Sequence, residues 1–254
     1  MRHRTLFSIC FSGVVTACAG VAPAAQLHVP RDFATLELAV QQAVSGDVIL
    51  LQPGIHDYLQ IEIAGKSLSI LGEGTVPSDT ILRHSLNDEG FGPTITVSNA
   101  ASFRLENVRV VGAKGRTGYP PAQCNGGTGG PGYAAVLLLD VANVALRSVE
   151  MLGGEGGLGM SNSGGCPAGG KMGNGGPALE LTAGSFVDLT DSTSEGGDGF
   201  AVGPAISLNG NSHLIGRGVT LGFASTAWEA PEIRLLDALS TVSGISPTET
   251  WVIY

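Results

Sequence analysis

A repeat of about 22 residues with alternating apolar positions occurs four times, and it limits the possible folds more than any other feature. The copies run Thr94–Gly115, Ala135–Gly156, Ala178–Gly199 and Ala205–Ser225, and offsets of 41, 43 and 27 residues superimpose them. Apolar residues at i and i+2 are typical of strands with one buried face. Since so short a unit cannot bury that face alone, successive copies must stack on one another.

The superimposed copies place apolar residues in columns, which are Ile95, Val136, Leu179 and Ile206; Val97, Leu138, Leu181 and Leu208; Phe103, Val144, Val187 and Leu214; and Leu105, Leu146 and Leu189. Each copy therefore predicts a strand, a turn, a second strand and a glycine turn, which is one coil of a parallel sheet. The alternative is an antiparallel sandwich, but its hairpins would not repeat the same in/out order at the same offsets. The repeat thus predicts an all-β solenoid, a single-stranded parallel β-helix.

Glycine-rich insertions separate the copies at one corner of the predicted coil, at residues 116–134, 157–177 and 200–204. Each has a proline near its end, at Pro131, Pro177 or Pro204, and a proline favours extended geometry in the residue before it. Between Gly112 and Gly203 lie 25 of the 39 glycines of the chain. Such segments offer little apolar surface to bury, so ordering them costs much conformational entropy.

Residues 1–25 have the pattern of a signal peptide, which predicts export. Basic residues at Arg2–Arg4 precede the apolar stretch Leu6–Val15, which is too short to span a membrane. Ala22–Ala24 then offers a small-x-small cleavage site. Val15–Cys18 also resembles the bacterial lipoprotein motif, in which Cys18 would carry the lipid. The expected location is therefore extracellular, periplasmic or anchored to the outer membrane as a lipoprotein.

The charge balance is acidic. Removal of Arg2 and Arg4 with the leader changes the formal charge from −9 to −11. This argues against nucleic acid and anionic membrane surfaces as partners, because bulk charge would repel both. It agrees with a solvated surface or with a cation-dependent partner.

Cys124 and Cys166 remain after export, and they lie at similar depths in the two long insertions. Because these insertions leave equivalent corners of successive coils, stacking should bring the two thiols together. A disulfide is the expected outcome in an exported protein. A metal–thiolate pair is the weaker alternative, since no histidine or further cysteine lies nearby in the sequence.

Residues 26–74 predict a cap followed by the first coils. A short strand, Gln26–Val29, precedes a helix that Pro30 and Asp32 would open and Gly46 would close, with an apolar stripe formed by Phe33, Leu36, Val40, Ala43 and Val44. A helix laid over the open end of a parallel coil shields its edge from pairing with other chains.

This region also resembles a known family. Residues 29–36 (VPRDFATL), 39–43 (AVQQA), 46–49 (GDVI), 53–56 (PGIH) and 66–72 (KSLSILG) are similar to the start of bacterial pectin-lyase-like right-handed parallel β-helix domains. The resemblance implies a right-handed coil, an exported location and a superfamily in which polysaccharide-active enzymes are common, although many members have no known chemistry. The Gln-Ala-Val-type and Asp-Phe-Ile-Phe-Gly-type segments of pectin methylesterases are absent, which argues against esterase activity.

Charged residues on the outward columns form the strongest candidate for a catalytic site. The register places Glu106 beside Arg147 and Arg109 beside Glu150, close to Asp140. No cofactor is expected unless the protein is a lyase, which would need a basic side chain and acidic groups that hold a cation such as calcium. The alternative is cross-strand ion pairs on a solvated face, each worth less than about 1 kcal/mol.

Other candidates are weaker. An acidic group in the third copy could supply a carboxylate pair for hydrolysis or bind calcium, although a solvated acidic edge explains it better; it consists of Glu180, Asp188, Asp191, Glu195 and Asp198. The histidines lack metal-ligand spacing, so no metal site is predicted. Trp228 and Trp251 could stack on sugar rings, or they could cover the C-terminal end of the coil.

The sequence therefore predicts a signal peptide at 1–25 and one β-helix domain at 26–254. Within that domain, 26–74 is the N-terminal cap and first coils, 94–225 the repeated rungs, and 226–254 the C-terminal cap. The favoured function is a non-catalytic envelope or extracellular protein that presents loops or binds glycans, with a polysaccharide or another cell-surface component as its partner. The alternatives are a polysaccharide lyase or glycoside hydrolase, and a purely structural surface protein.

Overall fold

The computed structural model describes residues 23–58, 60–85, 92–118, 127–160 and 170–223, and the backbone of three short strands further on. Several predicted features lie outside the described residues: most of the leader with Cys18, the two loop cysteines Cys124 and Cys166, and the tryptophans Trp228 and Trp251. Their predicted roles stay predictions. No helix in the described part of the chain is long and apolar enough to cross a bilayer.

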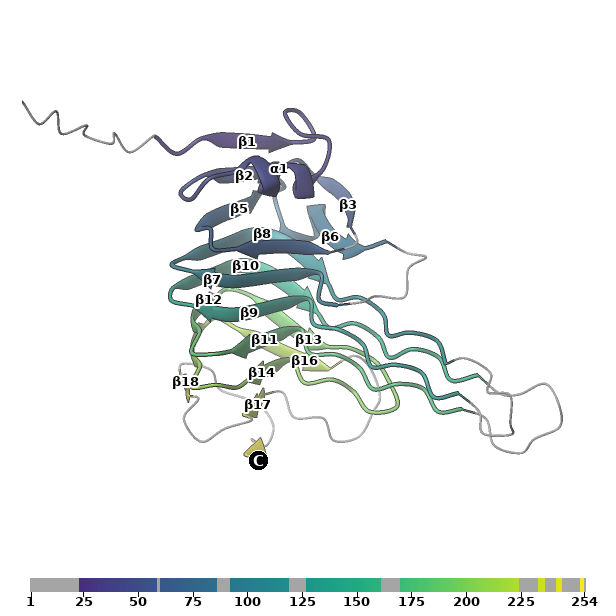
Figure 1. The fold of residues 1–254 in the computed structure, drawn as a ribbon. Coiled ribbons are helices and arrows are strands. Elements are labelled where there is room, and N and C mark those ends of the chain that lie inside the picture. Colours follow the sequence, from purple (N-terminus) through teal and green to yellow (C-terminus); the bar gives the residue numbers. More distant parts are fainter. Residues whose placement is uncertain are drawn as a thin grey trace, which may run out of the picture.

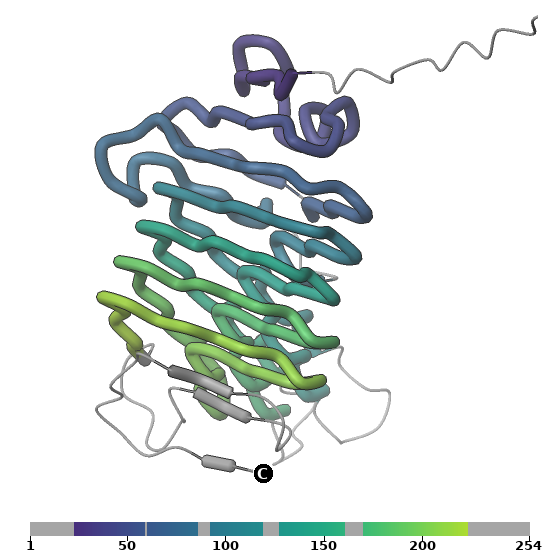
Figure 2. The backbone as a smooth tube through the Cα atoms, turned by 90° about the vertical axis from the view of Figure 1, so that its left-hand side faces the viewer, coloured from purple at the N-terminus to yellow at the C-terminus, as the bar shows by residue number. Residues whose placement is uncertain are grey.

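Two parallel sheets wrap around one apolar core (Figures 1 and 2). The main path of sheet A consists of β1 (Gln26–Val29), β2 (Val48–Leu51), β5 (Leu68–Gly72), β8 (Phe103–Val111), β10 (Val144–Leu152), β12 (Phe186–Thr190), β15 (His213–Arg217) and β18 (Thr241–Ser243). Its side strands are β3 (Gly54–Tyr58), β6 (Thr80–His84), β13 (Thr193–Gly196) and β16 (Thr220–Phe223). Sheet B consists of β4 (Ile61–Ala64), β7 (Ile95–Ala100), β9 (Val136–Val141), β11 (Leu179–Thr182), β14 (Ile206–Leu208), β17 (Ile233–Leu235) and β19 (Val252–Ile253).

The strand register follows the sequence repeat. In sheet B, Val136 of β9 pairs with Ile95 and Leu179, and Leu179 in turn pairs with Ile206. All of these pairings are parallel, which confirms the offsets of the repeat and excludes the antiparallel sandwich. The fold is a single-stranded right-handed parallel β-helix, as predicted, and the columns of apolar side chains fill its interior.

Two corners of each coil are made by a residue with a left-handed backbone conformation. At the corner between the two halves of sheet A, these residues and their φ values are Asn107 (54°), Ser148 (48°), Asp191 (47°) and Gly218 (62°). At the corner between sheets B and A they are Asn99 (52°), Asp140 (54°), Ala183 (56°) and Gly210 (66°), and the last two are each followed by a second such residue, Gly184 (80°) and Asn211 (61°). Asparagine, aspartate and glycine tolerate this conformation best, so they recur at both corners.

Ala183 is the exception at its corner, because it has neither the flexibility of glycine nor a polar side chain. We expect Ala183→Gly to raise the free energy of unfolding by up to about 1 kcal/mol, since glycine adopts a positive φ without steric cost. Ala64→Gly, at an exposed position of β4, should instead lower it by about 0.5–1 kcal/mol. Urea denaturation would measure the change in the free energy of unfolding for both variants. A loss of stability in Ala183→Gly would contradict the prediction.

The N-terminal helix forms, but it begins later than the sequence predicts. Helix α1 spans Leu36–Gln42, and the Thr35 hydroxyl accepts the Leu38 N–H at 3.4 Å. Val44 is 60% exposed rather than part of the buried stripe. The residues before Thr35 form a turn after β1, while α1 packs against β4, the first strand of sheet B. A short 3-10 helix, η1 (Pro77–Asp79), precedes β6.

The glycine-rich insertions form extended arms that leave and re-enter the coil at one corner (Figure 1). In the first outgoing arm, Gly112, Gly115 and Gly118 donate their N–H groups at 2.8 Å to the carbonyls of Leu152, Glu155 and Leu158. One such bond at every third residue is the periodicity of a polyproline-II helix, which has three residues per turn. The arms are therefore regular structures, although they belong to neither sheet.

Returning arms form a second layer beneath the outgoing ones. Gly157 donates to the Gly130 carbonyl, and Gly173 donates to the Gly157 carbonyl, both at 2.8 Å. We call this two-layered assembly the glycine slab; its described residues are 112–118, 127–134, 153–160, 170–177 and 196–204. Hydrogen bonds between the layers and between the rungs offset the conformational entropy that these glycine-rich segments lose when they become ordered.

The spacing of glycines follows the packing of the slab. A Cβ on Gly157 would overlap the carbonyl oxygen of Arg116, so an interior arm needs glycine at two of every three positions. The first outgoing arm has Ala113 and Arg116 where the second has Gly154 and Gly157, and these two glycines are the positions that contact the carbonyl oxygens of Ala113 and Arg116. Prolines such as Pro131 fall at the third position, whose nitrogen makes no bond within the slab.

Candidate functional site

The outer face of sheet A carries the charged columns that the sequence predicts. Strand β10 pairs with β8 so that Arg147 lies beside Glu106 and Glu150 lies beside Arg109. The Arg109 Nε and Glu150 Oε2 atoms are 3.8 Å apart, and both side chains are about one-third exposed. This predicted pair therefore forms, with the modest strength of a solvated ion pair.

The other predicted pair has the expected register but different partners. Glu106 forms its ion pair with Arg104, two residues earlier on the same face of β8. Arg147 is exposed and makes no ion pair with any described residue. The four candidate residues are thus neighbours, but they do not converge on a common point, and their assignment as catalytic groups stays a prediction.

Asp188 of β12 is held by two neighbours on this face. Its carboxylate accepts the Thr190 hydroxyl at 3.1 Å and the Arg217 Nη2 at 3.0 Å. These contacts fix the carboxylate in place while leaving it near the surface, with its side chain 31% exposed. Asp188 can therefore present an oriented acceptor to a ligand.

The acidic group of the third copy is spread around the coil. Asp188 lies on β12 and Glu195 on β13, whereas Asp191 forms a corner and Asp198 belongs to the glycine slab. Glu180 lies on β11 of the other sheet, where burial raises the pKa of its carboxyl group. Among the described residues, no three histidine, cysteine, aspartate or glutamate side chains gather into a metal site.

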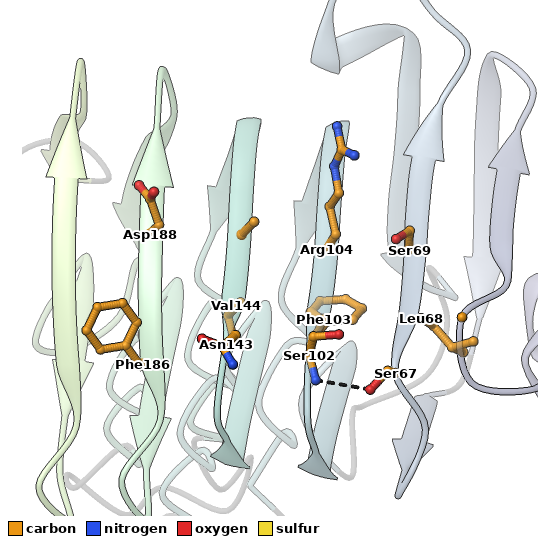
Figure 3. A pocket seen from close by; sticks show the side chains of 12 residues that line it. Ser67, Leu68, Ser69, Ser102, Phe103, Arg104, Asn143, Val144, Phe186 and Asp188 are labelled. Atoms are coloured by element: carbon orange, nitrogen blue, oxygen red, sulfur yellow. Dashed lines mark hydrogen bonds between the residues drawn. The ribbon is translucent and has the colours of Figure 1, made fainter. Parts of the chain in front are cut away.

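A groove of about 470 Å³ crosses the beginning of four strands of sheet A (Figure 3). Its lining comes from β5, β8, β10 and β12 and the turns before them; it includes Ser67, Ser69, Ser102, Arg104, Asn143, Phe186 and Asp188. With neighbouring strands about 4.8 Å apart, three spacings make the groove roughly 14 Å long. It follows the coil axis, so each rung contributes one set of side chains.

Phe186 lies at the end of the groove that β12 forms, on the same strand as Asp188 (Figure 3). The Phe186 ring is 39% exposed, and its centroid lies 6.4 Å from that of the His213 ring on the next rung. The sequence analysis missed this residue. The available signal was an aromatic residue directly before the inward-facing Val187, where the strand alternation calls for a polar one.

Ordered polar groups surround the apolar part of the groove. The Ser67 hydroxyl accepts the Ser102 N–H at 3.1 Å (Figure 3). The Asn143 amide donates to the Ala101 carbonyl at 3.4 Å. Serine and asparagine side chains keep further donors and acceptors for a ligand. An exposed aromatic ring beside convergent polar groups is a combination that suits an amphipathic ligand.

Comparisons with known proteins found similarity only at the level of solved structures. No protein-family model matches the chain, and no curated protein does. Escherichia coli YbhC is 12% identical, with 96% of this chain and 68% of that chain covered and a TM-score of 0.47. Two pectin methylesterase structures with bound hexasaccharides are 14% identical, each with 90% of this chain and 68% of the other covered, at TM-scores of 0.39 and 0.42.

The β-helix fold of this chain is established by its own parallel strand pairing.

Proposed function

We propose that this protein is an exported, non-catalytic β-helix protein that binds a polysaccharide chain in the groove on sheet A. The observation that carries the proposal is the groove itself, in which the exposed Phe186 ring lies beside hydrogen-bonding side chains from four successive rungs. Sugar rings have apolar faces and polar edges, so they match an aromatic surface bordered by such groups.

The direction of the groove favours a linear ligand. The groove runs along the coil axis, and the same outward columns recur from β5 to β12. A linear polymer can therefore contact each rung in turn, and along one column it would meet Ser69, Arg104, Ala145 and Asp188. A single small molecule would use only part of this length.

The charged side chains of the groove favour binding over catalysis. Arg104 pairs with Glu106, and Asp188 is held by Arg217 and Thr190. A glycoside hydrolase needs two carboxyl groups at a set separation, with one of them kept protonated. Glu180, whose carboxyl pKa is raised by burial, lies on sheet B and does not line the groove.

Export completes the proposal, because a polysaccharide ligand lies outside the cytoplasm. The signal-peptide pattern of residues 1–25 supports it, and the lipoprotein motif at Cys18 is a second route to the same surface. Labelling with a radioactive fatty acid would distinguish the anchored from the secreted form. Non-reducing peptide mapping would test the proposed Cys124–Cys166 disulfide.

Replacing Phe186 tests the groove. Binding to a panel of acidic and neutral polysaccharides identifies a ligand, and titration calorimetry then measures its affinity. We expect Phe186→Ala to weaken binding about tenfold or more, or about 1.4 kcal/mol, because loss of an aromatic contact commonly costs this much. The ring faces outward, so the fold should be retained.

Phe200→Ala is the matched control, because Phe200 is also an exposed phenylalanine, at 62%, but lies in the glycine slab. It should bind the polysaccharide like the wild type. Equal affinity of Phe186→Ala and wild type would contradict the groove as the site. Release of reducing ends or unsaturated products from any polysaccharide would show an enzyme instead.

A further inference from the structure

The glycine slab has a step where the third arm ends closer to the coil than the second arms do. This step lies away from the groove on sheet A. The third arm turns back around Phe200, whereas the second outgoing arm is described as far as Met160 and the second returning arm from Gly170 onward. Figure 1 shows the shorter hairpin against the longer ones above it. The second arms therefore extend beyond the third, and their last described turns have no arm from the next rung below them.

Two backbone donors at this step differ from the equivalent donors nearer the coil, which bond to the third arm. Gly156 donates to the Asp198 carbonyl at 2.7 Å, and Gly175 donates to the Ala201 carbonyl at 2.8 Å. One turn further from the coil, the equivalent donors are the N–H groups of Gly159 and Met172. Within the described part of the chain, neither of these groups has a hydrogen-bond acceptor.

In the rung above, the equivalent N–H groups have hydrogen-bond acceptors. There the N–H groups of Gly118 and Gly129 reach the carbonyls of Leu158 and Lys171 in the second arms, at 2.8 and 2.9 Å. At the step, the second arms repeat this donor arrangement one rung lower. Because Leu158 belongs to the outgoing arm and Lys171 to the returning arm, the missing neighbours are two extended chains, one below each second arm, whose carbonyl groups recur with the threefold period of the slab.

Apolar side chains border the unpaired donors. Leu158 is 54% exposed, Met160 44% and Phe200 62%, which are among the largest exposures of apolar side chains in the described residues. The Lys171 ammonium group lies 4.9 Å from the centroid of the Phe200 ring. An aromatic ring beside unpaired donors is the arrangement with which proteins bind polyproline-II peptides.

We infer that the step, defined by Leu158, Gly159, Met160, Lys171, Met172 and Phe200, binds an extended polypeptide in the polyproline-II conformation, with glycine facing the slab. Two such segments would add one more rung to the slab, as an added strand extends a sheet. A carbonyl of one segment would accept the Gly159 N–H group and a carbonyl of the other the Met172 N–H group, and outer residues would contact the Phe200 ring.

The packing of the slab specifies the composition of this ligand. Interior positions exclude a Cβ, because a Cβ on Gly156 or Gly173 would overlap a neighbouring carbonyl oxygen. Outward positions accept proline, as Pro131 and Pro177 show. A chain with the repeat Gly-Gly-Pro meets both conditions, and proline also reduces the entropy lost on binding.

The test is calorimetric titration of the full mature protein with the peptide (Gly-Gly-Pro)4. Met172→Pro removes one donor while keeping a backbone angle that the extended arm allows. Met172→Ala removes the side chain but keeps the N–H group. We expect Met172→Pro and Phe200→Ala to weaken binding about tenfold, and Met172→Ala to weaken it less than Met172→Pro does.

The peptide (Ala-Ala-Pro)4 and Phe186→Ala serve as controls. The alanine peptide should not bind, since its Cβ atoms would clash with the slab, whereas Phe186→Ala should bind (Gly-Gly-Pro)4 normally. The inference is overturned if (Gly-Gly-Pro)4 does not bind, if the alanine peptide binds equally, or if Met172→Pro leaves the affinity unchanged. Polysaccharide binding should be the same in wild type and Met172→Pro, so failure of this inference is separable from failure of the proposed function.

Discussion

Replacing Gly129 by alanine is expected to disrupt the glycine slab and to lower the free energy of unfolding by at least about 3 kcal/mol. The added Cβ would overlap the carbonyl oxygen of Gly157 in the next outgoing arm. That atom belongs to a backbone held by hydrogen bonds on both sides, so it cannot move aside as a side chain would. Overpacking against a rigid backbone therefore lowers the free energy of unfolding by an amount at the upper end of the usual range for overpacked sites.

Gly130→Ala is the matched control, one residue away in the same arm. Its Cβ would lie 3.2 Å from the Arg116 nitrogen as its nearest contact, because this position faces the edge of the slab. We expect a change of less than about 1 kcal/mol, which small shifts of the neighbour can absorb. Thermal melts would compare the variants, and amide hydrogen exchange at Gly115 and Gly157 would report on the arms themselves.

Equal stability of the two variants would contradict the packing of the slab. Unchanged exchange rates at the arm amides in Gly129→Ala would do the same. Faster exchange in the arms with unchanged exchange in β8 and β10 would show that the slab unfolds separately from the coil.

Leu138→Ala is expected to lower the free energy of unfolding by about 2–5 kcal/mol. Leu138 is fully buried in β9, in a column with Val97 above it and Leu181 below it. Truncation leaves a cavity that rungs held in register on both sides cannot close, so both the transfer and the cavity costs apply. Urea denaturation would measure the change, if the transition is two-state.

Leu139→Ala provides the comparison, since Leu139 is the next residue along β9 and faces outward. Its half-buried side chain pairs with Ser98 and Thr182 on the neighbouring strands. We expect a loss of less than about 1.5 kcal/mol, because water can fill the space that the side chain leaves. A larger loss for Leu139→Ala than for Leu138→Ala would reverse the assignment of the two faces of sheet B.

The register of the coil could be predicted because it depends on local alternation. Val97, Leu138 and Leu181 share a column only when the copies are offset by 41 and 43 residues, and a slip of one residue would turn each strand inside out. The pairing of Arg109 with Glu150 followed from the same register. The helix start was predicted at Pro30 and Asp32, but the helix begins at Leu36, because the Thr35 side chain caps it.

The order of the glycine arms could not be derived from composition, because glycine raises the entropy of any isolated segment. Their stability comes from hydrogen bonds between arms far apart in sequence, such as that from Gly157 to Gly130. The Gly-Gly-x spacing is nonetheless visible in the sequence. It reflects the two positions in every three at which an arm lies too close to neighbouring arms to allow a Cβ. Likewise, the choice of Glu106 between Arg104 and Arg147 depends on side-chain geometry rather than register.

The sequence by itself determined the coil: its parallel register, its apolar interior and the corner from which the insertions leave, since each follows from a short-range pattern repeated at fixed offsets. Only the tertiary structure decided the groove beside Phe186 and the step beside Phe200. Both are made by side chains and backbone groups from successive rungs, and their shape depends on where each rung ends in space. Stacking brings such groups together, and no single copy of the repeat contains them.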